Sequence, residues 1–185
     1  MSKIGLKPLD LKNAKIVERK DDCVKISGIE GEIIVDRVPS FISFKVENEV
    51  LYLDIEDKDD LVQKKMWGTT ASRLENALNG VRKKFSRTVE VVGNGFAISL
   101  KERVLEFKIG YSHIVPVKLP EGMEIITKIN TKTKTINSIE LKHVDKQLLN
   151  NFVSHLEMLR SVNPYSGKGV HADGKTYQRK SANKK

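Results

Sequence analysis

Residues 49–85 read EVLYLDIEDKDDLVQKKMWGTTASRLENALNGVRKKF, and the spacing of their apolar side chains changes part-way along. Residues 49–55 alternate apolar and polar side chains, which is typical of a half-buried strand. From Trp67 to Phe85 the apolar side chains recur every three or four residues, which forms one face of an amphipathic helix. Asp60 and Gln63 precede this face with the spacing of a capping box. The stretch therefore predicts a strand followed by a helix whose apolar face continues to Phe85.

The same order of elements recurs in the second half of the chain. Strand-like segments lie at residues 24–26, 32–35 and 42–46 before the first helix, and at residues 89–92, 96–100, 104–109, 113–118, 123–126 and 136–141 after it. A second helical stripe follows, made of Leu148, Phe152, Leu156, Leu159 and Val162. Asp145 stands before this stripe as its expected cap.

The two halves superpose when they are offset by 81 residues. Pro39 then falls on Pro120, and Trp67 falls on Leu148. We infer an α+β fold of two tandem similar domains, each a small antiparallel sheet packed against one helix. The expected domains are residues 1–81 and 82–162, followed by a basic C-terminal tail at 163–185. Because leucine takes its place in the repeat, Trp67 is expected in the core.

The positive charge of the chain is unevenly distributed. The formal net charge is +9, with 33 Lys and Arg against 24 Asp and Glu. Residues 21–80 are acidic, with a net charge of −6, whereas residues 81–185 carry +11. A solvated charged face would also give a basic total, but it has no need to segregate the two signs. Residues 1–20 are also basic, with a net charge of +4, so the pattern indicates a polyanionic partner for the second half and the two ends of the chain.

The sequence lacks the residue patterns that several kinds of site require. Gly167-Lys168-Gly169 lacks the upstream glycine and the Ser or Thr of a phosphate-binding P-loop. The acidic residues 54–60 lack the central glycine of an EF-hand, and the four histidines have no paired metal spacing. We therefore expect no catalytic residue, no metal site and no cofactor.

The chain also carries no sign of a membrane or an oxidising compartment. No apolar run approaches the roughly 20 residues that span a bilayer. Cys23 is the single cysteine, so an internal disulfide is impossible and a reducing compartment is expected.

The segment after the second helix is the most specific part of the sequence. Residues 163–170 read Asn-Pro-Tyr-Ser-Gly-Lys-Gly-Val, and lysines and an arginine follow to the end of the chain. Glycines allow backbone amides to approach phosphates, and Tyr165 can stack. With few aliphatic side chains, residues 163–185 are expected to be poorly ordered alone and to become ordered on their partner. A solvated tail that only aids solubility remains the alternative.

This order of residues resembles the C-terminal signature of large-subunit ribosomal protein family six, of the bacterial and organellar type. Motifs in the same order along the chain agree: the start at residues 1–8, Gly68-Thr69-Thr70, Gly110-Tyr111-Ser112-His113 and Asp145-Lys146-Gln147. Ser166 departs from the family pattern, which has lysine at this position.

The resemblance implies a structural constituent of the large ribosomal subunit, located in the cytoplasm or in an organelle. Family members bind 23S-type ribosomal RNA near the stalk base, beside neighbouring ribosomal proteins and the docking site of translation GTPases. A free-standing RNA-binding regulatory protein is the main alternative, and an enzyme acting on RNA, which would need a catalytic group absent from these motifs, is the other. The expected RNA-binding residues are Lys83, Lys84, Arg87, Tyr111, Ser112, His113, Lys146, Arg160, Asn163, Pro164, Tyr165, Gly167, Lys168, Gly169, Lys175, Arg179 and Lys180.

Overall fold

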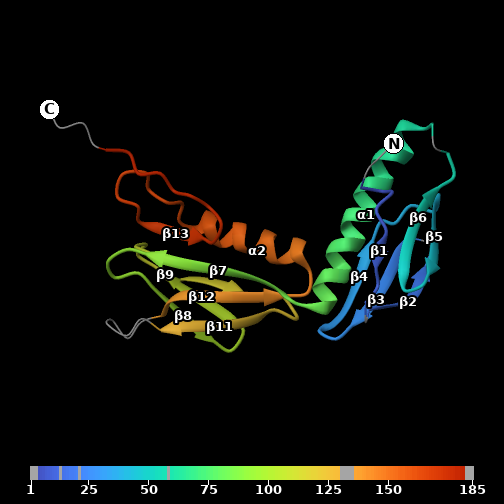
Figure 1. The fold of residues 1–185 in the computed structure, drawn as a ribbon. Helices are drawn as coiled ribbons and strands as arrows, with labels where there is room; N and C mark the ends of the chain where they lie inside the picture. The colour runs from blue at the N-terminus through green and yellow to red at the C-terminus, as the bar shows by residue number, and fades with distance from the viewer. Residues whose placement is uncertain (1–3, 13, 21, 58, 130–135, 182–185) are drawn as a thin grey trace. The chain divides into compact units, whose positions relative to one another are not determined.

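The computed structural model describes residues 4–12, 14–20, 22–57, 59–129 and 136–181 (Figure 1). Residues 1–3 of the opening motif and the last two lysines of the tail lie outside this part. The chain divides into two compact units. The first unit comprises Met1–Phe85 with Val144–Lys146, and the second comprises Ser86–His143 with Gln147–Lys185. The division of the chain into independent domains at residues 81 and 162 stays a prediction.

The first unit contains six strands and the longer of the two helices in the described residues. Its elements are β1 (Leu9–Asp10), β2 (Lys15–Lys20), β3 (Cys23–Gly28), β4 (Gly31–Asp36), β5 (Ile42–Glu47), β6 (Val50–Ile55) and α1 (Leu61–Arg82). The strands form two antiparallel sheets, in the orders β1-β6-β5 and β2-β3-β4. The α+β class is thus confirmed, but the single small sheet expected in this half is divided in two.

The apolar stripe of α1 packs into the core of the first unit, as its period predicts. Trp67 is 3% exposed, and Leu74 and Leu78 are fully buried with it. Alternate residues of β6 face the same core, among them Leu51 and Leu53. The prediction that Trp67 is a core residue is confirmed.

The ends of α1 agree with the sequence at one terminus and differ at the other. Asp60 caps the start, because its Oδ1 accepts a hydrogen bond from Val62 N at 2.8 Å. The expected continuation of the helical face to Phe85 is wrong. Lys83 already has an extended backbone, with φ −147° and ψ 121°, and Phe85 begins the next strand. Because the backbone of Phe85 belongs to this strand, its side chain does not continue the face of the helix.

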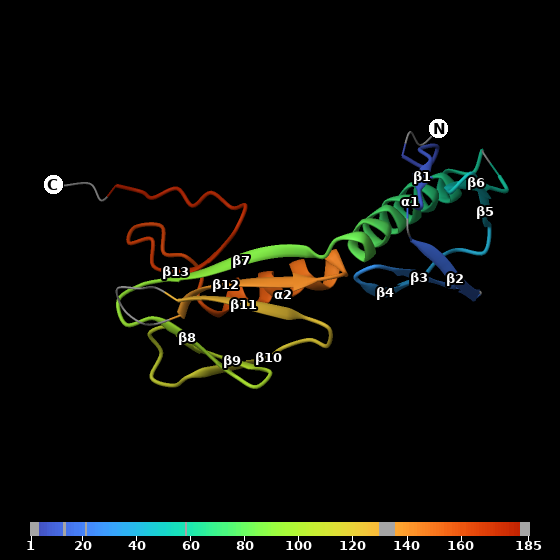
Figure 2. The ribbon, with the colours of Figure 1, turned by 60° about the horizontal axis from the view of Figure 1, so that its bottom comes forward.

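The second unit is built on one large antiparallel sheet. Its elements are β7 (Phe85–Val92), β8 (Ala97–Lys101), β9 (Val104–Lys108), β10 (Val115–Lys118), β11 (Glu124–Ile129), β12 (Ile136–His143), α2 (Lys146–Leu159) and β13 (Gly169–Ala172). The strand order is β10-β9-β8-β12-β7-β13, and β11 also pairs with β12. Figure 2 shows this order within the unit, from β13 to the β9–β10 end.

Helix α2 covers the sheet of this unit with its apolar stripe. Leu149, Phe152 and Leu156 are buried, as are Ile139 and Leu141 of β12. The helix ends at Leu159, so Val162, the last residue of the predicted stripe, lies in the following loop. A sheet with one covering helix in this half confirms the predicted unit.

The tail does not behave as its composition predicts. Strand β13 pairs with β7, placing Val170 opposite Val91 and Ala172 opposite Val89. Val170 is fully buried and Ala172 is 5% exposed. The expectation that the tail is poorly ordered without RNA is therefore wrong for residues 169–172. Two alternating apolar residues suffice here, because the sheet of the second unit supplies the rest of the core.

Candidate nucleic-acid interface

An aromatic–arginine cluster, made of Tyr111, His113 and Arg160, lies at the C-terminal end of α2. The Tyr111 hydroxyl donates a hydrogen bond to the Leu159 carbonyl at 2.9 Å. The Arg160 guanidinium carbon lies 5.1 Å from the centre of the Tyr111 ring, within cation–π range. The His113 ring stacks beside Tyr111, with ring centres 5.9 Å apart and planes 13° apart. All three residues are exposed, so the cluster as a whole is accessible to bases or phosphates.

A short loop at residues 163–168, which we call the tail loop, follows directly from this cluster. Asn163 Oδ1 accepts hydrogen bonds from the amides of Tyr165 at 2.8 Å and Ser166 at 3.1 Å. The Asn163 amide in turn donates to the Lys168 carbonyl at 2.9 Å. This closed turn leaves the Tyr165 ring 62% exposed and the Lys168 side chain in solvent. Asn163 thus holds the loop that presents two of the predicted RNA-binding side chains.

Two glycines of the tail signature have structural roles in this loop. Gly167 and Gly169 are both buried, with φ values of +69° and +148°. A Cβ atom on Gly169 would lie 2.8 Å from Val162 Cα and 2.9 Å from the Ser161 carbonyl oxygen. Contacts within the protein therefore explain why these positions are glycine, whereas RNA contact through their backbone stays a prediction.

The end of the described chain returns to the tail loop. The Lys180 amide donates a hydrogen bond to the Pro164 carbonyl at 2.9 Å. The Arg179 side chain lies against Gly167, where a Cβ atom would come within 2.5 Å of Arg179 Nε. Both cationic side chains are exposed. The fold therefore brings Arg179 and Lys180 beside a loop that precedes them by more than ten residues.

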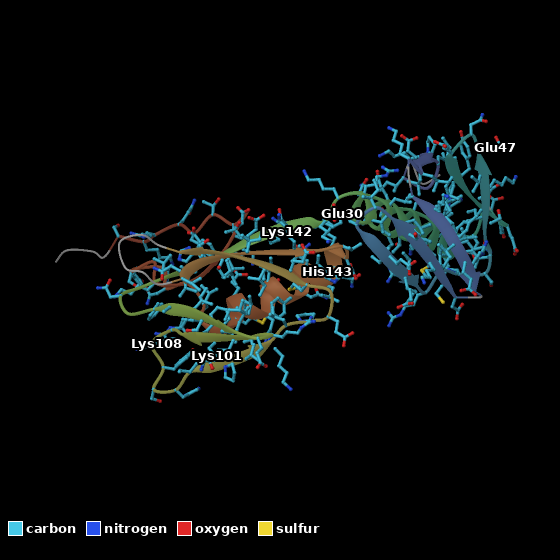
Figure 3. The ribbon with its side chains drawn as sticks, turned by 90° about the horizontal axis from the view of Figure 1, so that it is seen from below. Glu30, Glu47, Lys101, Lys108, Lys142 and His143 are labelled. Atoms are coloured by element: carbon cyan, nitrogen blue, oxygen red, sulfur yellow. The ribbon has the colours of Figure 1, made fainter. Side chains whose placement is uncertain are left out.

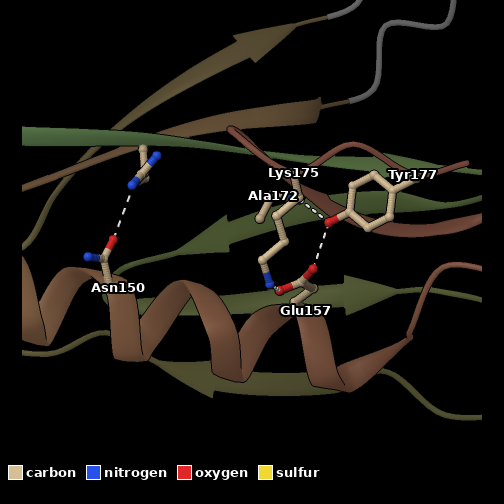
Figure 4. Close-up of polar contacts among 6 residues, drawn as sticks. Asn150, Glu157, Ala172, Lys175 and Tyr177 are labelled. Atoms are coloured by element: carbon tan, nitrogen blue, oxygen red, sulfur yellow. Dashed lines mark hydrogen bonds and ion pairs between the residues drawn. The ribbon is translucent and has the colours of Figure 1, made fainter.

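Glu157 of α2 holds this returning segment through two side chains (Figure 4). Lys175 forms an ion pair with the Glu157 carboxylate. The Tyr177 hydroxyl donates to Glu157 Oε1 at 2.6 Å and accepts a hydrogen bond from the Ala172 amide at 3.1 Å. The Tyr177 ring also meets His171 edge-on, with ring centres 4.6 Å apart. We call Glu157, Lys175 and Tyr177 the tail latch.

The tail latch affects the ionisation of its own groups. Partial burial works to raise the pKa of Glu157, but hydrogen bonds from Lys175 and Tyr177 outweigh it, so the pKa is lowered. Burial and the hydrogen bond to Glu157 raise the pKa of the Tyr177 hydroxyl. The charged carboxylate and the neutral phenol are therefore the forms that the folded protein favours.

Glu157→Gln should lower the free energy of unfolding by about 1–2 kcal/mol at neutral pH, because a charged hydrogen-bond acceptor is lost. The lowered pKa fixes the sign of the pH dependence. The contribution of Glu157 is fully present above its ordinary value of 4.5 and is lost as pH falls through the lower folded value. Urea unfolding of both proteins at several pH values measures this difference. A difference that stays constant from neutral to strongly acidic pH would contradict the role of the carboxylate.

Comparisons with known proteins address the identity of this chain. A family model described as ribosomal protein L6 matches residues 92–173. A large ribosomal subunit protein uL6 of Onion yellows phytoplasma is 32% identical over 185 residues, covering 100% of this chain and 96% of the relative. The uL6 protein of Desulfovibrio desulfuricans is 33% identical, covering 97% and 96%. That of Rhodospirillum rubrum is 31% identical and covers both chains completely.

The chain belongs to the uL6 family. The matched residues 92–173 include the aromatic–arginine cluster, the tail loop and β13. Arg179 and Lys180 lie beyond the end of this match. The resemblance suggested by the sequence motifs is thus confirmed along the whole chain.

The remaining predicted RNA-binding residues of this uL6-family chain lie elsewhere. Arg87 Nε donates to Asn150 Oδ1 at 3.2 Å inside the second unit. Lys83, Lys84 and Lys146 belong to the first unit. There Lys84 Nζ lies 3.2 Å from a Glu30 carboxylate oxygen. Lys146 Nζ donates to Asn76 Oδ1 at 3.2 Å. Ser112, which lies between Tyr111 and His113 in the sequence, is exposed.

Some further charged and polar residues of the second unit were not predicted from the sequence. Lys101 and Lys108, labelled in Figure 3, are exposed on β8 and β9 of the second unit. Their polar positions in alternating strands were a usable signal. Glu157 and Tyr177 had no such signal, because 20 residues separate them along the chain.

Two further features are absent from the described residues. No group of three or more His, Cys, Asp or Glu side chains there could hold a metal ion. No helix of the described chain is both long and apolar enough to cross a membrane.

Proposed function

We propose that this uL6-family chain is a structural component of the large ribosomal subunit and that its second unit binds 23S-type ribosomal RNA. The observation that carries the proposal is the exposed aromatic–arginine cluster joined to the tail loop. Membership in the family makes the chain a ribosomal protein of the large subunit and not an enzyme. Its place of action is therefore the ribosome.

The chemistry of this surface suits structured RNA. Arg160 and Lys168 can neutralise phosphates, while Tyr111, His113 and Tyr165 offer flat faces to unstacked bases. The rings would serve unpaired bases, whereas an RNA helix would be recognised by its shape through 2′-hydroxyl and phosphate contacts. The net charge of +11 over residues 81–185 favours this half, and the −6 over residues 21–80 favours an orientation of the first half away from dense RNA.

We also propose a position near the stalk base, next to neighbouring ribosomal proteins and close to where translation GTPases dock. This position rests on the resemblance of the motifs, above all Gly110-Tyr111-Ser112-His113 and the tail signature. Residues 82–162 would form the RNA-binding domain, with the tail as its extension. Residues 1–81 would form a domain with an acidic body and a basic N-terminal arm.

Co-sedimentation with large subunits in high-salt sucrose gradients tests the ribosomal role. We expect the full chain to remain with the subunit after the salt wash. A free-standing RNA-binding regulator would leave the subunit and bind an isolated transcript with sequence preference. That outcome would overturn the proposal in favour of the alternative.

Arg160→Glu and Lys168→Glu should each weaken binding to large-subunit RNA fragments about tenfold or more, because a cation beside phosphates becomes an anion. The slope of log affinity against log salt concentration should also become shallower by about one, which corresponds to the loss of one phosphate contact. Filter binding at several salt concentrations measures both quantities.

Lys65→Glu is the matched control, since this exposed lysine lies on α1 in the acidic first unit. Its affinity should stay close to that of the parent protein. Equal weakening by Lys65→Glu and Arg160→Glu would mean that only total charge matters and that the cluster is not the interface. Thermal unfolding of all three variants should show that each still folds.

A further inference from the structure

The chain contains two Asn-Gly dipeptides in contrasting surroundings. Asn79–Gly80 lies inside α1, whereas Asn94–Gly95 forms the turn between β7 and β8. We propose that Asn94 is a site of spontaneous deamidation through a succinimide and that Asn79 is protected from the same reaction. This inference goes beyond the proposed function and does not depend on it.

The reaction needs only the asparagine, the next backbone amide and water. The backbone nitrogen of Gly95 attacks the side-chain Cγ of Asn94, and the Cγ–Nδ2 bond breaks as ammonia leaves. The five-membered imide that results is opened by water at either carbonyl, which yields aspartate or isoaspartate. One water is consumed, one ammonia is released, and nothing is oxidised or reduced. Glycine at the second position favours the attack because no side chain crowds the nitrogen.

The turn at Asn94 leaves the reacting groups free. The Phe96 amide donates to the Gly93 carbonyl at 3.3 Å, and Gly95 has a φ of +73° after an Asn94 with negative φ. This is the pattern of a type II turn, in which the third residue needs a positive φ. Asn94 and Gly95 are both exposed.

The space around Gly95 is open as well. A Cβ atom built on Gly95 would meet no heavy atom within 4 Å. Within the described part of the chain, the Gly95 amide donates no hydrogen bond. The peptide between Asn94 and Gly95 can therefore rotate to bring the nitrogen against Cγ without breaking other contacts.

The same dipeptide in α1 lacks this freedom. The Asn79 carbonyl accepts a hydrogen bond from the Lys83 amide at 3.0 Å. The Gly80 amide is inside the helix, where it donates to the carbonyl four residues earlier. Gly80 is buried, and Phe85 and Val144 pack against it. Attack by its nitrogen requires local unfolding of a buried helix end.

Deamidation at Asn94 would change the charge of the surface beside the loop that carries Tyr111. A Cβ atom on Gly93 would lie 2.6 Å from the Phe96 ring, and one on Gly110 would lie 2.9 Å from it. The turn and the loop that carries Tyr111 thus pack on the same ring. The new carboxylate would lower the formal net charge from +9 to +8 beside that loop.

The test is incubation of the full-length protein at mildly alkaline pH and 37 °C, followed by digestion and mass spectrometry of the peptides containing Asn79 and Asn94. A synthetic peptide of residues 91–98 serves as the unstructured reference. We expect Asn94 to react within about tenfold of the reference rate and Asn79 to react about a hundredfold more slowly than Asn94, because only Asn79 needs local unfolding. Enzymatic methylation of isoaspartate should label the Asn94 peptide.

Asn94→Gln is the matched variant, since glutamine would have to close a less favourable six-membered ring. It should abolish the isoaspartate label of the peptide that contains residue 94 while leaving thermal unfolding unchanged. Equal rates at Asn79 and Asn94, or an Asn94 that stays intact while the reference peptide reacts, would overturn the proposal. Because the reaction is followed by mass in the absence of RNA, the result is separate from that of the RNA-binding experiments.

Discussion

Trp67→Ala should lower the free energy of unfolding by about 3–5 kcal/mol, as expected for removal of a large aromatic side chain from a packed core. The indole is 3% exposed and packs with Ala71 and Leu74 in the core of the first unit. Its Nε1 donates a hydrogen bond to the Leu53 carbonyl at 3.1 Å. The backbone of Gly5 also lies against the ring, since a Cβ atom there would overlap it. Alanine would lose the packing and leave a buried carbonyl without its donor.

Urea unfolding followed by circular dichroism measures this loss, because Trp67 is the single tryptophan and its fluorescence disappears with it. Leu61→Ala is the matched control, since Leu61 lies on the same helix and is 69% exposed. It should change stability by less than about 0.5 kcal/mol. Unchanged stability of Trp67→Ala together with weakened RNA binding would instead make the indole a stacking platform.

Gly169→Ala should destabilise the second unit by about 3 kcal/mol and loosen β13. Its φ of +148° is a conformation that residues with a side chain rarely adopt, at a cost of about 1–3 kcal/mol. The added methyl group would also meet backbone atoms of Arg160, Ser161 and Val162 at 2.8–3.0 Å. Backbone cannot move aside as a flexible side chain does, so overpacking adds to the strain. Hydrogen exchange of the Val170 amide, which donates to the Arg160 carbonyl at 3.0 Å, reports the loosening directly.

Gly95→Ala separates the two contributions, because Gly95 also has a positive φ but has open space around it. It should cost only about 1 kcal/mol, the penalty of the backbone conformation alone. If both alanine variants cost the same, the close approach at Gly169 contributes nothing. If Gly169→Ala leaves Val170 exchange unchanged, the glycine does not hold the tail strand.

The role of Gly169 affects how the tail is tested for RNA binding. Deleting residues 164–185 removes β13 and uncovers the edge of β7, so a loss of binding could reflect a damaged fold. Charge reversal at Arg160 or Lys168 avoids this problem, because both side chains are exposed.

Local patterns in the sequence determined much of this protein. The period of two in residues 49–55 and the steps of three and four from Trp67 onward predict β6 and α1, since each period depends only on neighbouring residues. The cap at Asp60 is equally local. The repeat and the segregated charges predict two α+β units and a basic second half.

The tertiary structure decided what depends on residues far apart in the chain. Tyr111 meets Arg160 only because the sheet brings the end of β9 beside the end of α2. Phe85 fits the helical period, yet the extended backbone at Lys83 places it in a strand. The tail has too few aliphatic residues for a core of its own, but β13 needs only Val170 and Ala172 because β7 provides a preformed edge. Composition describes a segment in isolation. Its burial and hydrogen bonding depend on the strand or helix that the rest of the fold places beside it.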